Sequence, residues 1–266
     1  MPDTTASAAG DTVLETRGLT VRFGGHVAVN GVSAAFRRGT LTAIVGPNGA
    51  GKTTYFNLVS GQIPATAGEV FLFGKDISRL PAPLRTRRGI GRAFQLTNLF
   101  PFLTVHENVR IAVQSRAGVG IQFFSLWDSR RDLIEKADAI LEQVALTHQR
   151  DVPAMTLPHG DQRKLEVGLM LALEPEVYMF DEPTAGMSVD EVPVILDLIK
   201  RIKAGGDKCI LLVEHKMDVV RELADRIVVL HNGTLVADGA PAEVIASPVV
   251  QEAYLGIPAE RKEGTQ

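Results

Sequence analysis

Residues 46 to 53, with the sequence GPNGAGKT, have the residue types and spacing of a phosphate-binding loop. Glycines let the backbone curl so that its N–H groups point inward, where a following helix start adds positive potential for phosphate oxygens. Lys52 supplies a charge for the β and γ phosphates, and the hydroxyl of Thr53 is a ligand for Mg²⁺. An apolar run, LTAIV, precedes the loop and a helical stretch follows it. The sequence therefore predicts a nucleotide site formed by Gly46, Pro47, Asn48, Gly49, Ala50, Gly51, Lys52, Thr53 and Thr54.

A second stretch, EVYMFDEP, supplies the carboxylates that a nucleotide hydrolase needs. Its apolar residues predict a strand that delivers Asp181 to the strand end, where the carboxylate is a ligand for Mg²⁺. Glu182, the next residue, is placed to act as general base on the attacking water. An apolar run ending in Asp-Glu is a weak signal alone, and the phosphate-binding loop makes it a strong one.

Three further residues fit the same reaction. Gln95 follows the strand candidate GIGRAF, and from there it is expected to touch Mg²⁺ and water. His215 ends CILLVEH, where an imidazole can contact the γ-phosphate. Phe23 follows an early strand and is a candidate for stacking on adenine. Each has an alternative, because polar residues at strand ends are often structural and a lone Phe is often part of a core.

The sequence of residues 157 to 166, LPHGDQRKLE, predicts the start of a helix whose first turn binds a ligand. A short polar run leads directly into an amphipathic pattern, so the first turn of the expected helix offers N–H groups and the positive end of its dipole. The loops and strands above do not identify what this segment binds.

The elements that must position these residues alternate between strands and helices, which favours a largely parallel sheet covered on both faces. Thr104 to Glu107 has the form of a capping box, and from Leu133 to Val144 the apolar positions fall on one helix face. Residues 97 to 170 therefore read as a helical insertion. The apolar segment 118 to 127 is either a buried loop or a contact surface for another protein. Further expected elements are strands at 13–23, 32–36, 41–45, 69–73, 89–94 and 177–180, a helix at 189–203, a hairpin at Asn232-Gly233 and a tail helix at PAEVIAS.

Composition limits the classes of protein to consider. The chain has 266 residues, of which 45% are apolar and 22% charged, as in an ordinary globular protein. A formal net charge of −3 argues against a nucleic-acid-binding domain. Cys209, the single cysteine, is expected in a buried strand. No apolar run approaches the ~20 residues of a membrane span, and residues 1–11 are expected to be a disordered leader with no signal peptide.

These motifs together resemble those of the nucleotide-binding subunits of ABC transporters. GPNGAGKT, Gln95, LPHGDQRKLE, MFDEPTAG and His215 occur in the family's order, and the resemblance covers about residues 13 to 256. It implies an α/β P-loop NTPase cassette with a mixed β-sheet core, an antiparallel β subdomain and the inserted helical subdomain. It also implies one domain over 12–256, a flexible tail at 257–266, and ATP with Mg²⁺ as cofactors. The segment at 157 then corresponds to the signature motif, which binds ATP held by a second cassette through Leu157, Pro158, His159, Gly160, Asp161 and Gln162.

A finer resemblance is to the ATPases of branched-chain amino acid transporters, carried by FGGHVAVNGVS, GIGRAFQLTNLFPFLTVHENV, DEPTAGMS, VEHKMDVV and a C-terminal AYLG. It implies an ATP-hydrolysing importer subunit on the cytoplasmic face of the inner membrane. The implied partners are a second ABC ATPase subunit, identical or homologous, integral membrane permease subunits and, indirectly, a substrate-binding protein. Alternatives are an ATPase of lipid transport and a soluble ABC ATPase of the iron–sulfur assembly type.

Two residues depart from the family pattern. Pro158 stands where the common motif has Ser, so the hydroxyl that contacts the γ-phosphate is missing. Either one ATP site of the pair is weakened, or Pro158 only starts a helix. Ser188 stands where the loop after Glu182 often carries Asp.

Overall fold

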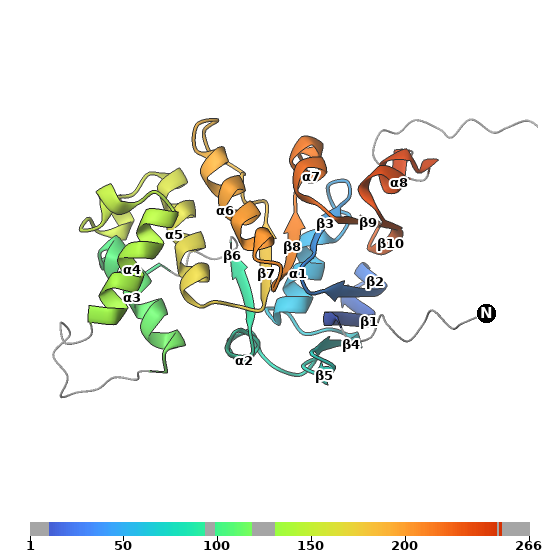
Figure 1. The fold of residues 1–266 in the computed structure, drawn as a ribbon. Helices are drawn as coiled ribbons and strands as arrows, with labels where there is room; N and C mark the ends of the chain where they lie inside the picture. The colour runs from blue at the N-terminus through green and yellow to red at the C-terminus, as the bar shows by residue number, and fades with distance from the viewer. Residues whose placement is uncertain (1–10, 94–98, 119–130, 249, 252–266) are drawn as a thin grey trace, which may run out of the picture. The chain divides into compact units, whose positions relative to one another are not determined.

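A computed structural model describes residues 11–93, 99–118, 131–248 and 250–251 (Figure 1). The chain forms two compact units, the first made of residues 1–87 and 209–266 and the second of residues 88–208. Gln95 and most of the apolar segment 118 to 127 lie outside the described residues. Our predictions for them stay predictions.

The first unit contains an antiparallel sheet with the strand order β2-β1-β4-β5. Its strands are β1 (Thr12–Phe23), β2 (His26–Arg37), β4 (Ala67–Leu72) and β5 (Lys75–Asp76). Strand β2 begins six residues earlier than predicted, because Gly24 adopts a φ of +57° in a tight turn that pairs Phe23 directly with His26. The antiparallel β subdomain implied by the resemblance is confirmed.

The first unit also contains a mixed sheet. Strand β3 (Leu41–Val45) pairs in parallel with both β8 (Cys209–Val213) and β9 (Arg226–His231), and β10 (Thr234–Gly239) pairs antiparallel to β9. Every residue of β3 and β8 is buried, including Cys209, whose thiol pKa burial raises to about 12. The predicted hairpin is confirmed, with positive φ at Asn232 and Gly233.

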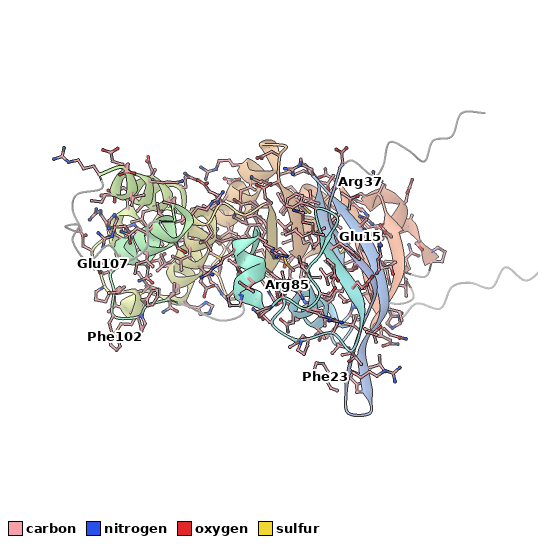
Figure 2. The ribbon with its side chains drawn as sticks, turned by 90° about the horizontal axis from the view of Figure 1, so that it is seen from below. Glu15, Phe23, Arg37, Arg85, Phe102 and Glu107 are labelled. Carbon is pink, nitrogen blue, oxygen red and sulfur yellow. The ribbon has the colours of Figure 1, made fainter. Side chains whose placement is uncertain are left out.

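The described part of the first unit also contains the helices α1 (Lys52–Ser60), α2 (Ala82–Arg87), α7 (Met217–Leu223) and α8 (Pro241–Ala246). Apolar side chains of β3, β9, α7 and α8 form one buried cluster. Arg85 of α2 is 3% exposed, and its guanidinium donates to the carbonyl oxygens of Leu58 and Val59 in α1 at 2.8 and 2.7 Å. It also donates to Leu80 and Ser78 at 2.8 Å each, so one buried side chain caps the end of α1 (Figure 2).

In the second unit, β6 (Ile90–Ala93) and β7 (Val177–Asp181) pair in parallel, with Ile90 opposite Val177 and Ala93 opposite Phe180. Helices α3 (Val105–Arg116), α4 (Arg131–Gln143) and α5 (His159–Ala172) pack on one another, and α6 (Val192–Ala204) follows β7. Two short 3-10 helices, η1 (Thr147–Gln149) and η2 (Ala154–Thr156), connect α4 to α5. The helical subdomain is confirmed, and its bounds of 97 and 170 stay a prediction.

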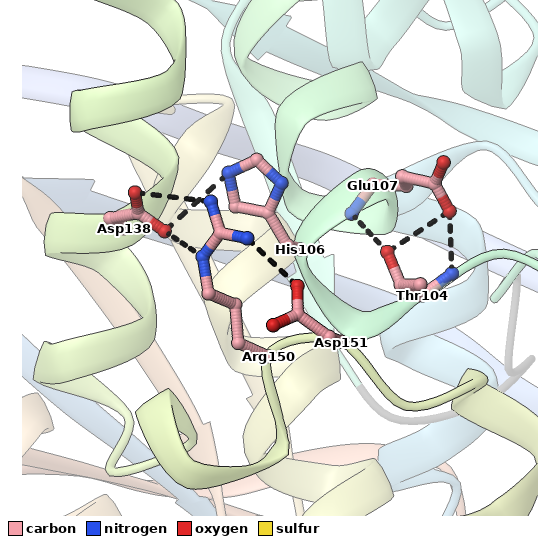
Figure 3. A network of polar contacts seen from close by, with 6 residues as sticks. All are labelled: Thr104, His106, Glu107, Asp138, Arg150 and Asp151. Atoms are coloured by element: carbon pink, nitrogen blue, oxygen red, sulfur yellow. Dashed lines mark hydrogen bonds and ion pairs between the residues drawn. The ribbon is translucent and has the colours of Figure 1, made fainter.

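Local sequence explains two of these helices. Thr104 Oγ1 accepts a hydrogen bond from the Glu107 amide at 3.1 Å, and Glu107 Oε2 accepts from the Thr104 amide at 2.8 Å, which is the predicted capping box (Figure 3). In α4 the predicted apolar face is buried at Leu133, Ala137, Ile140 and Leu141.

A polar network ties α3 to α4. Arg150 donates to both oxygens of Asp138, at 2.7 and 3.3 Å, and to Asp151 at 2.8 Å (Figure 3). His106 Nε2 of α3 lies 3.5 Å from Asp138. Burial is the largest cause that lowers the pKa of His106, and the positive charge of the nearby Arg150 is the second. The imidazole is therefore neutral at physiological pH, and the charges of the network belong to Arg150 and its carboxylates.

The prediction of a helix from residue 189 was wrong by three residues. Residues 188 to 191 form a turn in which the amides of Glu191 and Val192 both donate to the Ser188 carbonyl, at 3.1 and 3.2 Å. Helix α6 begins after this turn, at Val192.

Candidate functional site

The loop from Gly46 to Thr53 joins the end of β3 to the start of α1, as predicted. A Cβ at Gly46 would lie 2.1 Å from the Leu230 carbonyl oxygen, and a Cβ at Gly51 would lie 2.4 Å from that of Ala28. Gly49 and Gly51 also have φ of +79° and +95°. The close approach leaves no room for a side chain at Gly46 or Gly51, and at Gly49 the positive φ alone favours glycine.

Neighbouring strands hold the loop from outside. The amide of Gly233, in the β9–β10 hairpin, donates to the Ala50 carbonyl at 3.0 Å, and the Gly233 carbonyl accepts from the Asn30 amide of β2 at 2.8 Å. Ala50 itself is 2% exposed. The loop is therefore fixed to two strands by a short chain of hydrogen bonds.

The Lys52 side chain folds back over this loop. It is 6% exposed, and its ammonium donates to the carbonyl oxygens of Gly46 at 2.7 Å and Pro47 at 3.0 Å. These contacts hold a positive charge beside the exposed Asn48 and Gly49 and the half-buried Thr53 and Thr54. The arrangement fits an anionic ligand such as a phosphate chain.

Two other candidates of the first unit have different positions. His215 is exposed and follows β8, the parallel neighbour of β3, so it lies at the same sheet edge as the loop. Phe23 is 50% exposed at the hairpin between β1 and β2. Its ring is available for stacking, and the alternative of a core phenylalanine is wrong.

In the second unit, β7 delivers Asp181 to its carboxyl end as predicted, and the side chain is 4% exposed. Its Oδ2 accepts a hydrogen bond from Arg92 Nη2 of β6 at 2.9 Å. Glu182 is half-buried and has a φ of +52°, a conformation uncommon for a residue with a side chain. Sequence reasoning missed Arg92, although a charged residue inside the strand GIGRAF was a signal that it needed a partner.

The segment at 157 starts α5 as predicted. Pro158 is its N-cap residue with a φ of −56°, and the Pro158 carbonyl accepts from the Gln162 amide at 2.9 Å. The Gln162 side chain donates back to the Leu157 carbonyl at 2.9 Å. Pro158 therefore occupies a regular helix start, one position before the N1 site where proline is most favoured.

A carboxylate from the loop after β7 lies against this helix start. A Cβ at Gly160 would lie 2.2 Å from Glu191 Oε1, so the absence of a side chain there makes room for Glu191. Glu191 accepts from the Ser188 amide and hydroxyl at 3.0 and 2.9 Å, and these bonds lower its pKa. Lys164 pairs with Asp161 at 2.8 Å and with Glu191 at 3.5 Å. Sequence reasoning missed Lys164 and Glu191.

The predicted ligands suit Mg²⁺. In the described part of the chain no group of three or more His, Cys, Asp and Glu residues is placed to hold a metal. Mg²⁺ in nucleotide sites usually takes one or two protein oxygens and completes its shell with phosphates and water. Asp181, a buried carboxylate at a strand end of the second unit, and Thr53, a hydroxyl in the first turn of α1 in the first unit, each offer an oxygen of the kind that Mg²⁺ takes.

Comparison with known proteins shows which family the chain resembles. A family model described as ABC transporter matches residues 29–185, and one described as branched-chain amino acid ATP-binding cassette transporter matches residues 234–260. The chain is 37% identical to the high-affinity branched-chain amino acid transport ATP-binding protein BraF of Pseudomonas aeruginosa, over 92% of this chain and 98% of BraF. It is 35% identical to the corresponding protein LivG of Escherichia coli K12, over the same shares of each chain.

Solved structures show the same similarity. A crystal structure described as the ADP conformation of an ATP-binding cassette of an ABC transporter superposes with a TM-score of 0.77 at 30% identity. The match covers 92% of this chain and 99% of that one. A nucleotide-free ATP-binding cassette matches with the same TM-score and identity, over 92% of this chain and all of that one.

Proposed function

The chain belongs to the ABC transporter family, and on this premise we propose that it is the ATP-hydrolysing subunit of an importer for branched-chain amino acids or related amides. The observation that carries the proposal is the buried Lys52 ammonium inside a glycine loop between β3 and α1. The match of residues 234–260 to the branched-chain amino acid model and the names of the relatives support the solute class. The same match favours an importer over a lipid transporter or a soluble iron–sulfur assembly ATPase.

The predicted site residues have different roles in the hydrolysis of ATP. The backbone N–H groups of Gly46 and of Asn48 to Thr54 and the Lys52 ammonium bind the phosphates, with Pro47 shaping the loop, and Phe23 stacks on the adenine. Thr53, Asp181 and Gln95 hold Mg²⁺, which neutralises charge on the phosphate oxygens when bound. Glu182 accepts the proton of the attacking water, and His215 contacts the γ-phosphate.

A second ATPase subunit, identical or homologous, completes each site. The helix start from Leu157 to Gln162 contacts ATP bound by that partner. Pro158 offers neither a hydroxyl nor an N–H, so this contact depends on Gly160 and the rest of the first turn. If the partner is a homologous and not an identical chain, the site that borrows the signature segment of this chain is therefore the weaker of the two.

Permease subunits are the second class of partner. None of the helices in the described ranges has both the length and the apolarity of a membrane span. Phe102 is 80% exposed (Figure 2), and Phe100 and Met155 are 52% and 57% exposed. The Met155 amide donates to the Pro101 carbonyl at 3.0 Å, which joins the two segments. This apolar surface is part of the groove that we expect from Gln95 to about Val109, with the segment 118 to 127 nearby. The groove docks a short helix of a permease and holds the subunit peripherally at the cytoplasmic face of the inner membrane.

The experiment is ATP-driven uptake in vesicles containing the subunit, its ATPase partner and the permease, supplied with a binding protein and labelled leucine. The Lys52→Ala variant should lose ATP hydrolysis and uptake together, because it removes the loop ammonium. Full ATPase activity in Lys52→Ala contradicts the nucleotide site. Normal hydrolysis without co-purifying permease subunits supports the soluble ATPase alternative.

A further inference from the structure

A carboxylate lies against Gly160 in the first turn of α5. A Cβ at Gly160 would lie 2.2 and 2.3 Å from the two carboxylate oxygens of Glu191, so both oxygens lie against the Gly160 backbone. Gly160 is buried, although Pro158 and His159, the residues before it, are exposed. Glu191 therefore covers part of the signature segment at the position where the absence of a side chain would otherwise open the backbone to a ligand.

Three polar contacts hold Glu191 in this place. Its Oε2 accepts from the Ser188 amide at 3.0 Å and from the Ser188 hydroxyl at 2.9 Å, and its Oε1 lies 3.5 Å from the Lys164 ammonium. Lys164 also pairs with Asp161 at 2.8 Å, and its side chain is 10% exposed. All of these residues belong to the second unit, so the arrangement is defined within one compact unit.

The charges in this arrangement oppose the approach of an anion. Asp161 and Glu191 contribute two carboxylates and Lys164 one ammonium, which gives these three residues a formal charge of −1. The bonds from Ser188 lower the pKa of Glu191, which therefore carries its charge at neutral pH. A phosphate that approaches Gly160 meets this carboxylate, and the two negative charges repel each other. Because the N-terminal end of a helix attracts either anion, carboxylate and phosphate compete for the same place.

We infer that Glu191 is an autoinhibitory residue of the signature segment, whose carboxylate occupies the place at Gly160 that a phosphate of the partner-held ATP takes when the two ATPase subunits close. The inference rests on the proposed function, because it takes residues 157–162 as the segment that contacts that ATP. Closure then requires Glu191 to leave Gly160. The contacts with Ser188 and Lys164 oppose this step, so they favour the separated subunits until ATP is bound.

The test measures ATP-dependent dimerisation in the Glu182→Gln variant, where blocked hydrolysis lets the dimer accumulate. Analytical ultracentrifugation of this variant, alone and mixed with its ATPase partner, gives the dissociation constant of the dimer at saturating ATP and Mg²⁺. Adding Glu191→Gln keeps the shape and an oxygen that accepts from Ser188, but removes the charge. It should lower the dissociation constant by roughly two- to fivefold for each site that borrows this segment, the range of a partly exposed charge contact. Added salt should reduce the difference, because it screens the repulsion.

Two further variants separate charge from capping. Glu107 accepts from the Thr104 amide and hydroxyl at 2.8 and 3.0 Å, the same pattern of bonds as between Glu191 and Ser188. Glu107→Gln is therefore the matched control, and it should leave the dissociation constant unchanged. Ser188→Ala removes one of the bonds that hold Glu191, so it should lower the constant by a smaller factor than Glu191→Gln. If Glu191→Gln does not fold, Ser188→Ala decides the matter.

The outcomes separate the inference from the proposed function. A dissociation constant that Glu191→Gln leaves equal or raises would mean that Glu191 only caps its turn, and it overturns the inference. The affinity of the undimerised protein for a fluorescent ATP analogue should stay the same, because the inference places the effect on ATP held by the partner; a change there also overturns it. Absence of an ATP-dependent dimer in every variant would instead contradict the proposed pairing of ATPase subunits, and the inference with it.

Discussion

Replacing Arg85 with Met should destabilise the first unit strongly. Its guanidinium makes hydrogen bonds of 2.7 to 2.8 Å to four carbonyl groups, two of them at the end of α1, and the side chain is 3% exposed. A hydrogen bond to a charged group contributes ~1.5–3 kcal/mol, and the desolvation of Arg85 offsets part of the sum. We therefore expect a loss of about 3–5 kcal/mol, a large fraction of the ~5–15 kcal/mol of a typical domain.

The measurement is urea unfolding followed by circular dichroism, with the free energy of unfolding compared at constant m. Arg85→Lys is the matched control, since it keeps the charge but lacks the planar fork that spans several carbonyls, and it should recover only part of the loss. A loss below about 1 kcal/mol in Arg85→Met would refute the assignment of Arg85 as the cap of α1, because it would lie below the value of a single charged hydrogen bond.

Four further outcomes are expected. Glu107→Ala should lower the free energy of unfolding by about 0.5–1 kcal/mol at pH 7. Hydrogen bonds from Thr104 lower the pKa of Glu107 from its ordinary value of 4.5. The difference in unfolding free energy between the variant and the wild type should therefore vanish in unfolding curves as the pH falls below 4.5 and through that lowered pKa. The Glu182→Gln variant should retain ATP binding and form ATP-stabilised dimers, which size-exclusion chromatography detects. Pro158→Ser should raise ATP turnover at the partner's site by roughly ten- to hundredfold. If Pro158→Ser has no effect on turnover, Pro158 is only a helix-start residue. Phe102→Asp should reduce co-purification of permease subunits without lowering soluble ATPase activity, with Leu84→Asp as the exposed control on α2.

Short-range patterns carried most of what the sequence predicted correctly. The glycine loop, the capping box at Thr104 and the Asn232-Gly233 hairpin each depend on residues a few positions apart, so local chemistry identifies them. The late start of α6 could not be predicted in this way, since Ser188 and Glu191 have the same spacing as Thr104 and Glu107, which favours a helix start at 189 and not at Val192.

Contacts between distant segments could not be predicted in this way. Arg92 meets Asp181 across 89 positions because β6 and β7 pair in one particular register. Glu191 lies against Gly160 because a loop and a helix start approach each other, and no sequence pattern of either segment specifies that approach. Such pairs follow from the tertiary fold and not from any periodicity.

The hydrogen-bonded chain from Ala50 through Gly233 to Asn30 has a consequence for the kinetics of nucleotide exchange. A loop held by the β9–β10 hairpin, which is itself bonded to β2, forms a preorganised cradle, so little conformational entropy is lost when a nucleotide binds. Association then resembles docking to a rigid receptor, and release does not have to wait for the loop to unfold. The slow steps of the cycle are thereby left to the chemistry and to the separation of the two ATPase subunits.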